Sequence, residues 1–80
     1  MPRIIDKPSN NLIGENLHKL RIAKHMSQKA LADQLETIAV YVCRGSISRI
    51  ESGERTVTDI EIDGLCRVLG VSLNQLFYGK

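Results

Sequence analysis

The chain has 80 residues, which is enough for one domain with a small core. Its composition is 42% hydrophobic, 25% charged and 4% aromatic, values typical of a globular protein. No apolar run approaches the roughly 20 residues of a membrane-spanning helix, and residues 1–10 lack the apolar stretch of a signal peptide. We therefore expect a cytoplasmic protein that neither crosses a membrane nor is secreted.

The net charge of +2 is too small to indicate a nucleic-acid partner by itself. The charge is unevenly distributed, because residues 1–30 carry a balance of +4 and residues 31–80 a balance of −2. A basic end suits a surface that meets phosphates, although solvated helix faces often show the same asymmetry.

The two cysteines, Cys43 and Cys66, lie among aliphatic residues and lack the CxxC spacing of a redox or metal site. In a reducing cytoplasm such cysteines behave as small hydrophobic side chains. We expect both to be buried, without a disulfide.

Residues 1–10 contain two prolines and no periodicity, which predicts a flexible N-terminal arm before a single domain over residues 11–80. The first helix is predicted over residues 12–24. Asn11 can cap it, and Ile13 and Leu17 begin an apolar stripe with helical spacing.

A second helix is predicted over residues 28–39, with Ser27 as its cap and an apolar stripe that begins at Leu31. The apolar run from Ile38 to Val42 fits either a buried strand or a helix end followed by a packed turn. We favour the turn, because an isolated strand would have no partner to pair with.

Three short helices follow, over residues 44–52, 59–69 and 73–78. Gly53 can take the left-handed conformation that ends the first of them. The other two open with capping-box pairs, Thr58 with Glu61 and Ser72 with Gln75. The sequence therefore predicts an all-α domain of five helices.

The second and third predicted helices, joined by a compact apolar turn, have the pattern of a helix-turn-helix. In that motif the second helix lies in the DNA major groove, so its inner face must be apolar and its outer face must reach base edges. Ile47 and Ile50 supply the inner face. The outer face holds Arg44, Gly45, Ser46, Ser48 and Arg49. Arginine can bond guanine through two donors, serine can donate or accept, and glycine lets the backbone come close. A solvated helix with ordinary surface arginines is the alternative.

Three separated motifs follow one another along the chain: SQKALA from Ser27, SISRIESGER from Ser46 and LGVSLNQLF from Leu69. Together they resemble the XRE family of helix-turn-helix regulators, which includes Cro and the phage repressors. The resemblance covers about residues 12–77. It implies a compact five-helix, lambda-repressor-like domain, usually dimeric, that recognises short inverted repeats in double-stranded DNA.

The resemblance also implies roles for single residues. Gln28, at the start of the second helix, should bond a phosphate, and we expect the same of its neighbour Lys29. Arg55 matches a basic residue that touches the DNA backbone beside the recognition helix. Arg21 and Glu51 match a structural ion pair between the first and third helices, the alternative being two unrelated surface charges.

One feature departs from the family pattern. The interval between Leu35 and Ile47 holds eleven residues, more than the common pattern has, and Thr37 to Val42 replaces the usual turn residues. This resembles a branch with an extended turn, so we expect a longer second helix and a longer connection. We assign no DNA contact to the turn.

An enzyme is not expected. Asp59, Glu61 and Asp63 suit the start of a helix through its dipole, and His18 and His25 have no further ligand at zinc spacing. No catalytic constellation or phosphate-binding loop is present, so we expect no cofactor and no metal.

These inferences predict a sequence-specific transcriptional regulator, a repressor that binds an inverted-repeat operator as a homodimer. The chain ends three residues after Phe77, so we expect no small-molecule effector domain. We expect dimerisation through an apolar patch on the last helix, formed by Leu73, Leu76, Phe77 and Tyr78. The alternative is a protein-interaction module of the same fold, such as an antitoxin-like or antirepressor partner.

Overall fold

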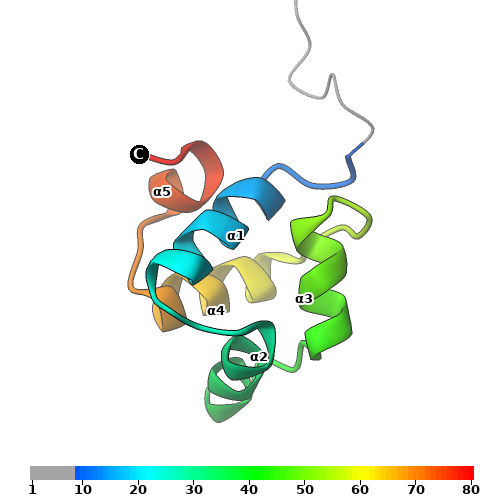
Figure 1. Ribbon diagram of the computed structural model, residues 1–80, viewed down its shortest axis with the longest axis vertical. Coiled ribbons are helices and arrows are strands. Elements are labelled where there is room, and N and C mark those ends of the chain that lie inside the picture. Colours follow the sequence, from blue (N-terminus) through cyan, green and yellow to red (C-terminus); the bar gives the residue numbers. More distant parts are fainter. Residues whose placement is uncertain (1–8) are drawn as a thin grey trace, which may run out of the picture.

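The computed structural model describes residues 9–80, which form five helices and no strand (Figure 1). The helices are α1 (Gly14–Ala23), α2 (Gln28–Thr37), α3 (Arg44–Glu51), α4 (Asp59–Leu69) and α5 (Leu73–Tyr78). The predicted all-α fold is confirmed. Helix α1 packs against α3 and α5, and α2 packs against α3 and α4. None of the helices in the described residues is both long and apolar enough to span a membrane.

Side-chain caps define the starts of three helices. The Ser27 hydroxyl accepts a hydrogen bond from the first turn of α2. Thr58 with Glu61 and Ser72 with Gln75 form complete capping boxes at α4 and α5, in which each side chain bonds the other residue's backbone N–H. These local signals explain why α4 and α5 start where predicted.

One apolar core joins all five helices. Nine of its side chains are fully buried: Ile13, Leu17, Leu31, Leu35, Ile47, Ile50, Leu65, Leu69 and Leu76. Ile47 and Ile50 belong to α3 and hold that helix to the domain along one side. The opposite side of α3 therefore faces outward.

Helix α1 begins two residues later than predicted, and its N-cap is Ile13 rather than the predicted Asn11. Asn11 lies just before the helix and contacts its start. Its Oδ1 accepts hydrogen bonds from the backbone N–H of Ile13 and of Gly14, at 3.1 and 2.7 Å. Its Nδ2 donates to the backbone carbonyls of Ile50 and Arg55, at 2.9 and 2.8 Å. One amide thus orders the start of α1 and joins it to the end of α3.

The predicted arm over residues 1–10 is described only in part, since residues 1–8 lie outside the described residues. The described part is not free. The backbone N–H of Asn10 donates to the carbonyl of Gly53 at 2.8 Å, and its side chain donates to the carbonyl of Glu54 at 3.0 Å. Asn10 is therefore held against the loop that follows α3.

Helix α2 ends at Thr37, two residues before the predicted end, and a turn follows it. Ala39 takes a left-handed conformation (φ +63°), and the N–H of Val40 donates back to the carbonyl of Leu35. The helix is therefore two residues shorter than predicted, and residues 38–43 form the connection to α3. Elsewhere α1 and α3 each end one residue earlier than predicted.

The expectation of two buried cysteines is also wrong. Cys43 is exposed and Cys66 is half-buried. Cys43 precedes α3 directly, so its backbone turns into the helix while Val42, one residue earlier, fills the core. Burial raises the pKa of the Cys66 thiol, and the charge of Asp63 adds to the effect.

Candidate nucleic-acid interface

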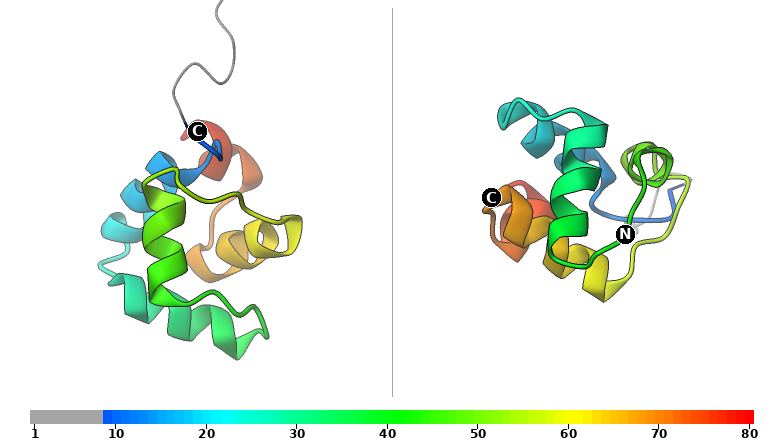
Figure 2. Two further views of the ribbon diagram at one scale, coloured as in Figure 1. Left: turned by 90° about the vertical axis from the view of Figure 1, so that its right-hand side faces the viewer. Right: turned by 90° about the horizontal axis from the view of Figure 1, so that it is seen from below.

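The outward side of α3 carries the residues that are predicted to face the DNA bases. Figure 2 (left) shows α3 in front of the molecule with α2 running beneath it. Arg44, Gly45, Ser48 and Arg49 are exposed, and Ser46 is half-buried. These five residues thus lie on one accessible helix, which is fixed to the domain by its two buried isoleucines.

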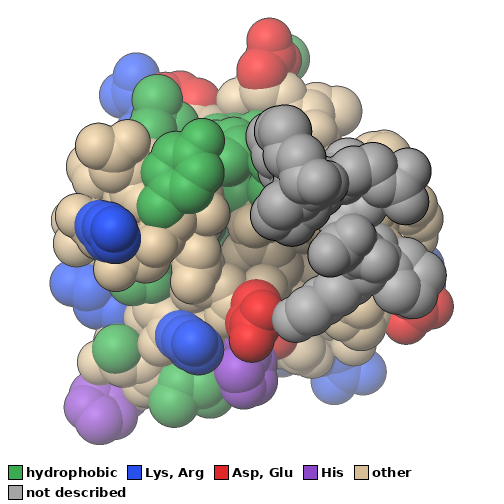
Figure 3. Space-filling view, turned by 90° about the horizontal axis from the view of Figure 1, so that it is seen from above, with side chains coloured by type: hydrophobic (Ala, Val, Ile, Leu, Met, Phe, Trp, Pro, Cys, Tyr) green, Lys and Arg blue, Asp and Glu red, His purple; other side chains and the backbone are tan. Residues whose placement is uncertain are grey.

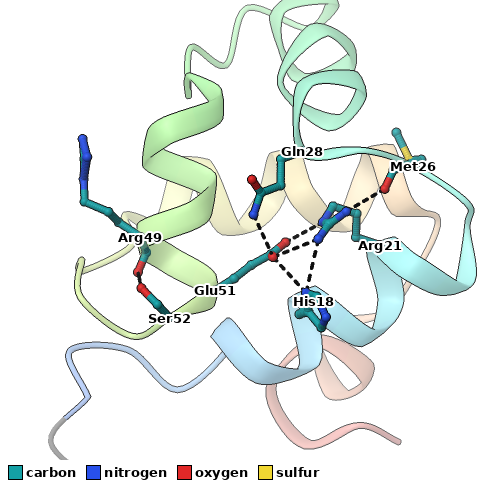
Figure 4. Close-up of polar contacts among 7 residues, drawn as sticks. All are labelled: His18, Arg21, Met26, Gln28, Arg49, Glu51 and Ser52. Atoms are coloured by element: carbon teal, nitrogen blue, oxygen red, sulfur yellow. Dashed lines mark hydrogen bonds and ion pairs between the residues drawn. The ribbon is translucent and has the colours of Figure 1, made fainter.

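Arg44 and Arg49 form no ion pair with any other residue of the described chain, 9–80. The guanidinium of Arg49 lies over Gly45, with its Nη1 and Nη2 at 3.9 Å from the place where a Cβ would stand. In Figure 4 the Arg49 side chain points away from the neighbouring polar contacts. Both positive charges therefore remain available to an anionic partner.

Glu51, at the end of α3, is the centre of a polar cluster with His18, Arg21 and Gln28 (Figure 4). Arg21 donates to the carboxylate through Nε at 2.6 Å and Nη2 at 3.0 Å, and also to the carbonyl of Met26 at 2.7 Å. His18 Nδ1 lies 3.0 Å from Glu51 Oε1. The Arg21–Glu51 pair therefore bridges α1 and α3.

The environment changes the ionisation of this cluster. Burial by itself would raise the pKa of Glu51. Hydrogen bonds from Arg21, His18 and Gln28 outweigh burial and hold the pKa below its ordinary value. The same hydrogen bond with Glu51 raises the pKa of Arg21. Both side chains are therefore charged over the whole neutral range.

Gln28 and Lys29, the residues at the start of α2 that are predicted to bind phosphates, have hydrogen-bond partners within the protein. Gln28 Nε2 donates to Glu51 Oε1 at 3.2 Å, which leaves the second N–H of its amide free to donate elsewhere. Lys29 pairs with Asp33 at 3.0 Å, but both side chains are largely exposed, so the pair is weak and Lys29 can exchange it for another anion.

Arg55 is held more firmly than sequence reasoning anticipated. Its Nη1 and Nη2 donate to the two carboxylate oxygens of Glu61, at 2.9 and 2.8 Å, and Nη1 also donates to the carbonyl of Thr56. The hydrogen bonds from Arg55 hold the pKa of Glu61 below its ordinary value. The Arg55–Glu61 pair orders the loop after α3. A guanidinium has five N–H donors, so Arg55 keeps further N–H groups that can donate to an acceptor outside the protein.

Sequence reasoning did not place Asn11, His18 or Glu61 in these contacts. His18 precedes Arg21 by three residues on α1, a spacing that would have put both side chains on one face. The capping box identified Glu61, but nothing local indicated that it also binds Arg55. In residues 9–80 no group of three or more His, Cys, Asp or Glu side chains is placed to hold a metal ion.

Comparison with known proteins agrees with this geometry. Residues 17–76 match the family model described as helix-turn-helix. No curated protein matches the chain. The match spans most of the chain, from α1 to α5, and includes both helices of the motif. The chain belongs to the XRE family of helix-turn-helix domains, which bind DNA.

Proposed function

We propose that the protein is a sequence-specific transcriptional repressor that binds an inverted-repeat operator as a homodimer. The observation that carries the proposal is that Arg44 and Arg49, on the outward side of α3, form no ion pair with any residue from 9 to 80. A helix fixed by two buried isoleucines can present such side chains to the major groove without reorganising.

In this proposal α3 lies in the major groove, and Arg44, Ser46 and Arg49 read base edges. Ser48 lies on the same outward side, and Gly45 lets the helix backbone approach the bases. Gln28, Lys29 and Arg55 bind phosphates and thereby set the register of the protein on the duplex. Glu51 supports this arrangement, because it holds the Gln28 amide at the start of α2.

An inverted repeat requires two copies of α3 related by a twofold axis, about one helical turn of DNA apart. Helix α5 offers an apolar surface for that pairing, since Leu73 and Tyr78 are 58% and 69% exposed and Phe77 is partly exposed. Leu76 belongs to the core instead, so the proposed patch is smaller than the sequence indicated. Figure 3 shows hydrophobic side chains together at the end of the molecule where α5 lies.

The first test is the binding of random-sequence duplex DNA as salt is raised. Phosphate contacts predict that the logarithm of the affinity falls linearly with the logarithm of the salt concentration. Binding that cannot be detected at low salt, on any DNA, would contradict the proposal and favour a protein-interaction module.

The second test is selection of binding sites from random duplexes, repeated with Arg44→Ala. If Arg44 reads a base, the variant should lose about 1–3 kcal/mol at one base position only. The matched control is Arg67→Ala, which removes an exposed arginine of α4 that is paired with Asp63. A selected site without twofold symmetry would refute the dimeric operator, and a reporter carrying the site within a promoter would distinguish a repressor from an activator.

A further inference from the structure

Tyr41 is the most exposed large hydrophobic side chain of the described residues, at 76%. It lies in the connection between α2 and α3, three residues before Arg44. Phe77 and Tyr78, the other aromatic residues, both lie in α5. Tyr41 makes no hydrogen bond with another described residue. Its ring and hydroxyl are therefore free for a contact outside the chain.

The backbone that carries Tyr41 is nevertheless well anchored. Its neighbours Val40 and Val42 are both buried, so the side chain between them is directed away from the core. Val40 packs closely on α4, where a Cβ on Gly64 would stand only 2.9 Å from Val40 Cγ2. Because the backbone at Tyr41 is already fixed, binding a partner would order this side chain alone and not the connection that carries it.

Tyr41 borders a hollow of about 480 Å³ between α2 and the start of α3. Lys29, Arg44 and Ser46, which belong to the proposed DNA-binding residues, line the same hollow. The hollow is thus continuous with the proposed DNA surface, and a duplex that receives α3 would pass over it.

The charges around the hollow indicate where a phosphate would lie. The α2 wall carries two carboxylates, Asp33 and Glu36, and one ammonium, Lys29, which is paired with Asp33, so its net charge is negative and disfavours a further phosphate. The opposite rim, formed by the connection and α3, carries Arg44 and Tyr41 and no acid. A phosphate at the edge of the major groove is therefore favoured beside these two residues.

Given the proposed function, on which this inference rests, we propose that Tyr41 also binds DNA, although it lies outside the recognition helix α3. Its hydroxyl donates to a backbone phosphate, and its ring packs against the adjoining sugar. The extended connection thereby enlarges the DNA surface at the N-terminal end of α3. Because every nucleotide of DNA carries the same phosphate group, this contact adds affinity without sequence preference.

The test compares Tyr41→Ala and Tyr41→Phe with the wild type on a selected site and on random duplex, each over a salt series. We expect Tyr41→Ala to weaken binding to both DNAs by the same factor, about threefold to tenfold, as one net hydrogen bond implies. Tyr41→Phe should show most of that loss. The salt slope should stay unchanged because no charge is removed, whereas Lys29→Ala, which removes a proposed phosphate contact, should reduce it.

Ile22→Ala is the matched control, because Ile22 is an exposed hydrophobic residue of α1 that does not belong to the proposed DNA-binding residues. Unfolding temperatures establish that the variants fold. Wild-type affinity in Tyr41→Ala, or in Tyr41→Phe, would overturn the inference. A loss confined to one base position would overturn it as well, in favour of base reading. If the wild type bound no DNA at all, the proposed function itself would fall.

Discussion

Glu51 forms hydrogen bonds with three side chains, from two other helices, and its own side chain is only 6% exposed. Replacing it by alanine removes every one of these bonds and leaves the Arg21 guanidinium, 7% exposed, without its counter-charge. Removing one partner of a buried ion pair costs about 3–5 kcal/mol. Because Arg21 keeps its hydrogen bond to the carbonyl of Met26, we expect the lower end, about 3 kcal/mol.

That loss is large for a domain of this size, whose total free energy of unfolding is expected at about 4–12 kcal/mol. At about 4–8 °C for each kcal/mol, Glu51→Ala should lower the unfolding temperature by at least about 12 °C. Thermal unfolding followed by circular dichroism, together with urea titration, would measure both quantities.

Asp63→Ala is the matched control, because it also removes the acid of an arginine pair. Asp63 and Arg67 have side chains that are 65% and 70% exposed, and such a surface pair contributes less than about 1 kcal/mol. The reasoning would be refuted if Glu51→Ala and Asp63→Ala destabilised the protein equally. In that case burial would not govern the strength of the pair.

The remaining predictions concern acid stability and two glycines. Glu51 and Glu61 have a lowered pKa in the folded state, so folding releases protons in acid, and the free energy of unfolding should fall as the pH drops below about 4.3. Urea titrations at several pH values should show that the free energy of unfolding of Glu51→Gln falls less steeply with pH than that of the wild type. An identical fall would show that the carboxylate of Glu51 does not contribute to the acid sensitivity. Gly14→Ala should destabilise the domain by more than about 1 kcal/mol in urea, because its Cβ would collide with the carbonyl oxygen of Ile50. There is room for a Cβ at Gly45, so Gly45→Ala should leave the unfolding temperature at or above the wild-type value. The same variant should weaken DNA binding, because the added methyl group would separate the helix backbone from the bases. Unchanged affinity would show that the backbone at Gly45 does not approach DNA.

Much of the fold could be predicted because its signals are local. A cap and an apolar stripe act within one or two turns of chain, so Thr58 with Glu61 and Ser72 with Gln75 sufficed to place α4 and α5. The inward position of Ile47 followed from helical spacing in the same way.

The candidate site was predictable to a different extent for each residue. The outward side of α3 followed from the same periodicity, because a helix with its apolar residues buried must expose the rest. By contrast, nothing near Arg55 in the sequence indicated that its guanidinium would be held by Glu61, since the loop between them has no regular period.

The sequence by itself determined which segments become helices, which side of α3 is apolar and which family the motifs resemble. Only the tertiary structure decided how those helices are tied together. Asn11 reaches the carbonyl of Ile50, 39 positions away, and Arg21 reaches Glu51, 30 positions away. It also decided that Cys43 and Tyr41 face outward, because the core accepts Val40 and Val42 from the same connection. Such contacts depend on how whole helices pack, and packing is a property of the assembled core that no short stretch of sequence specifies.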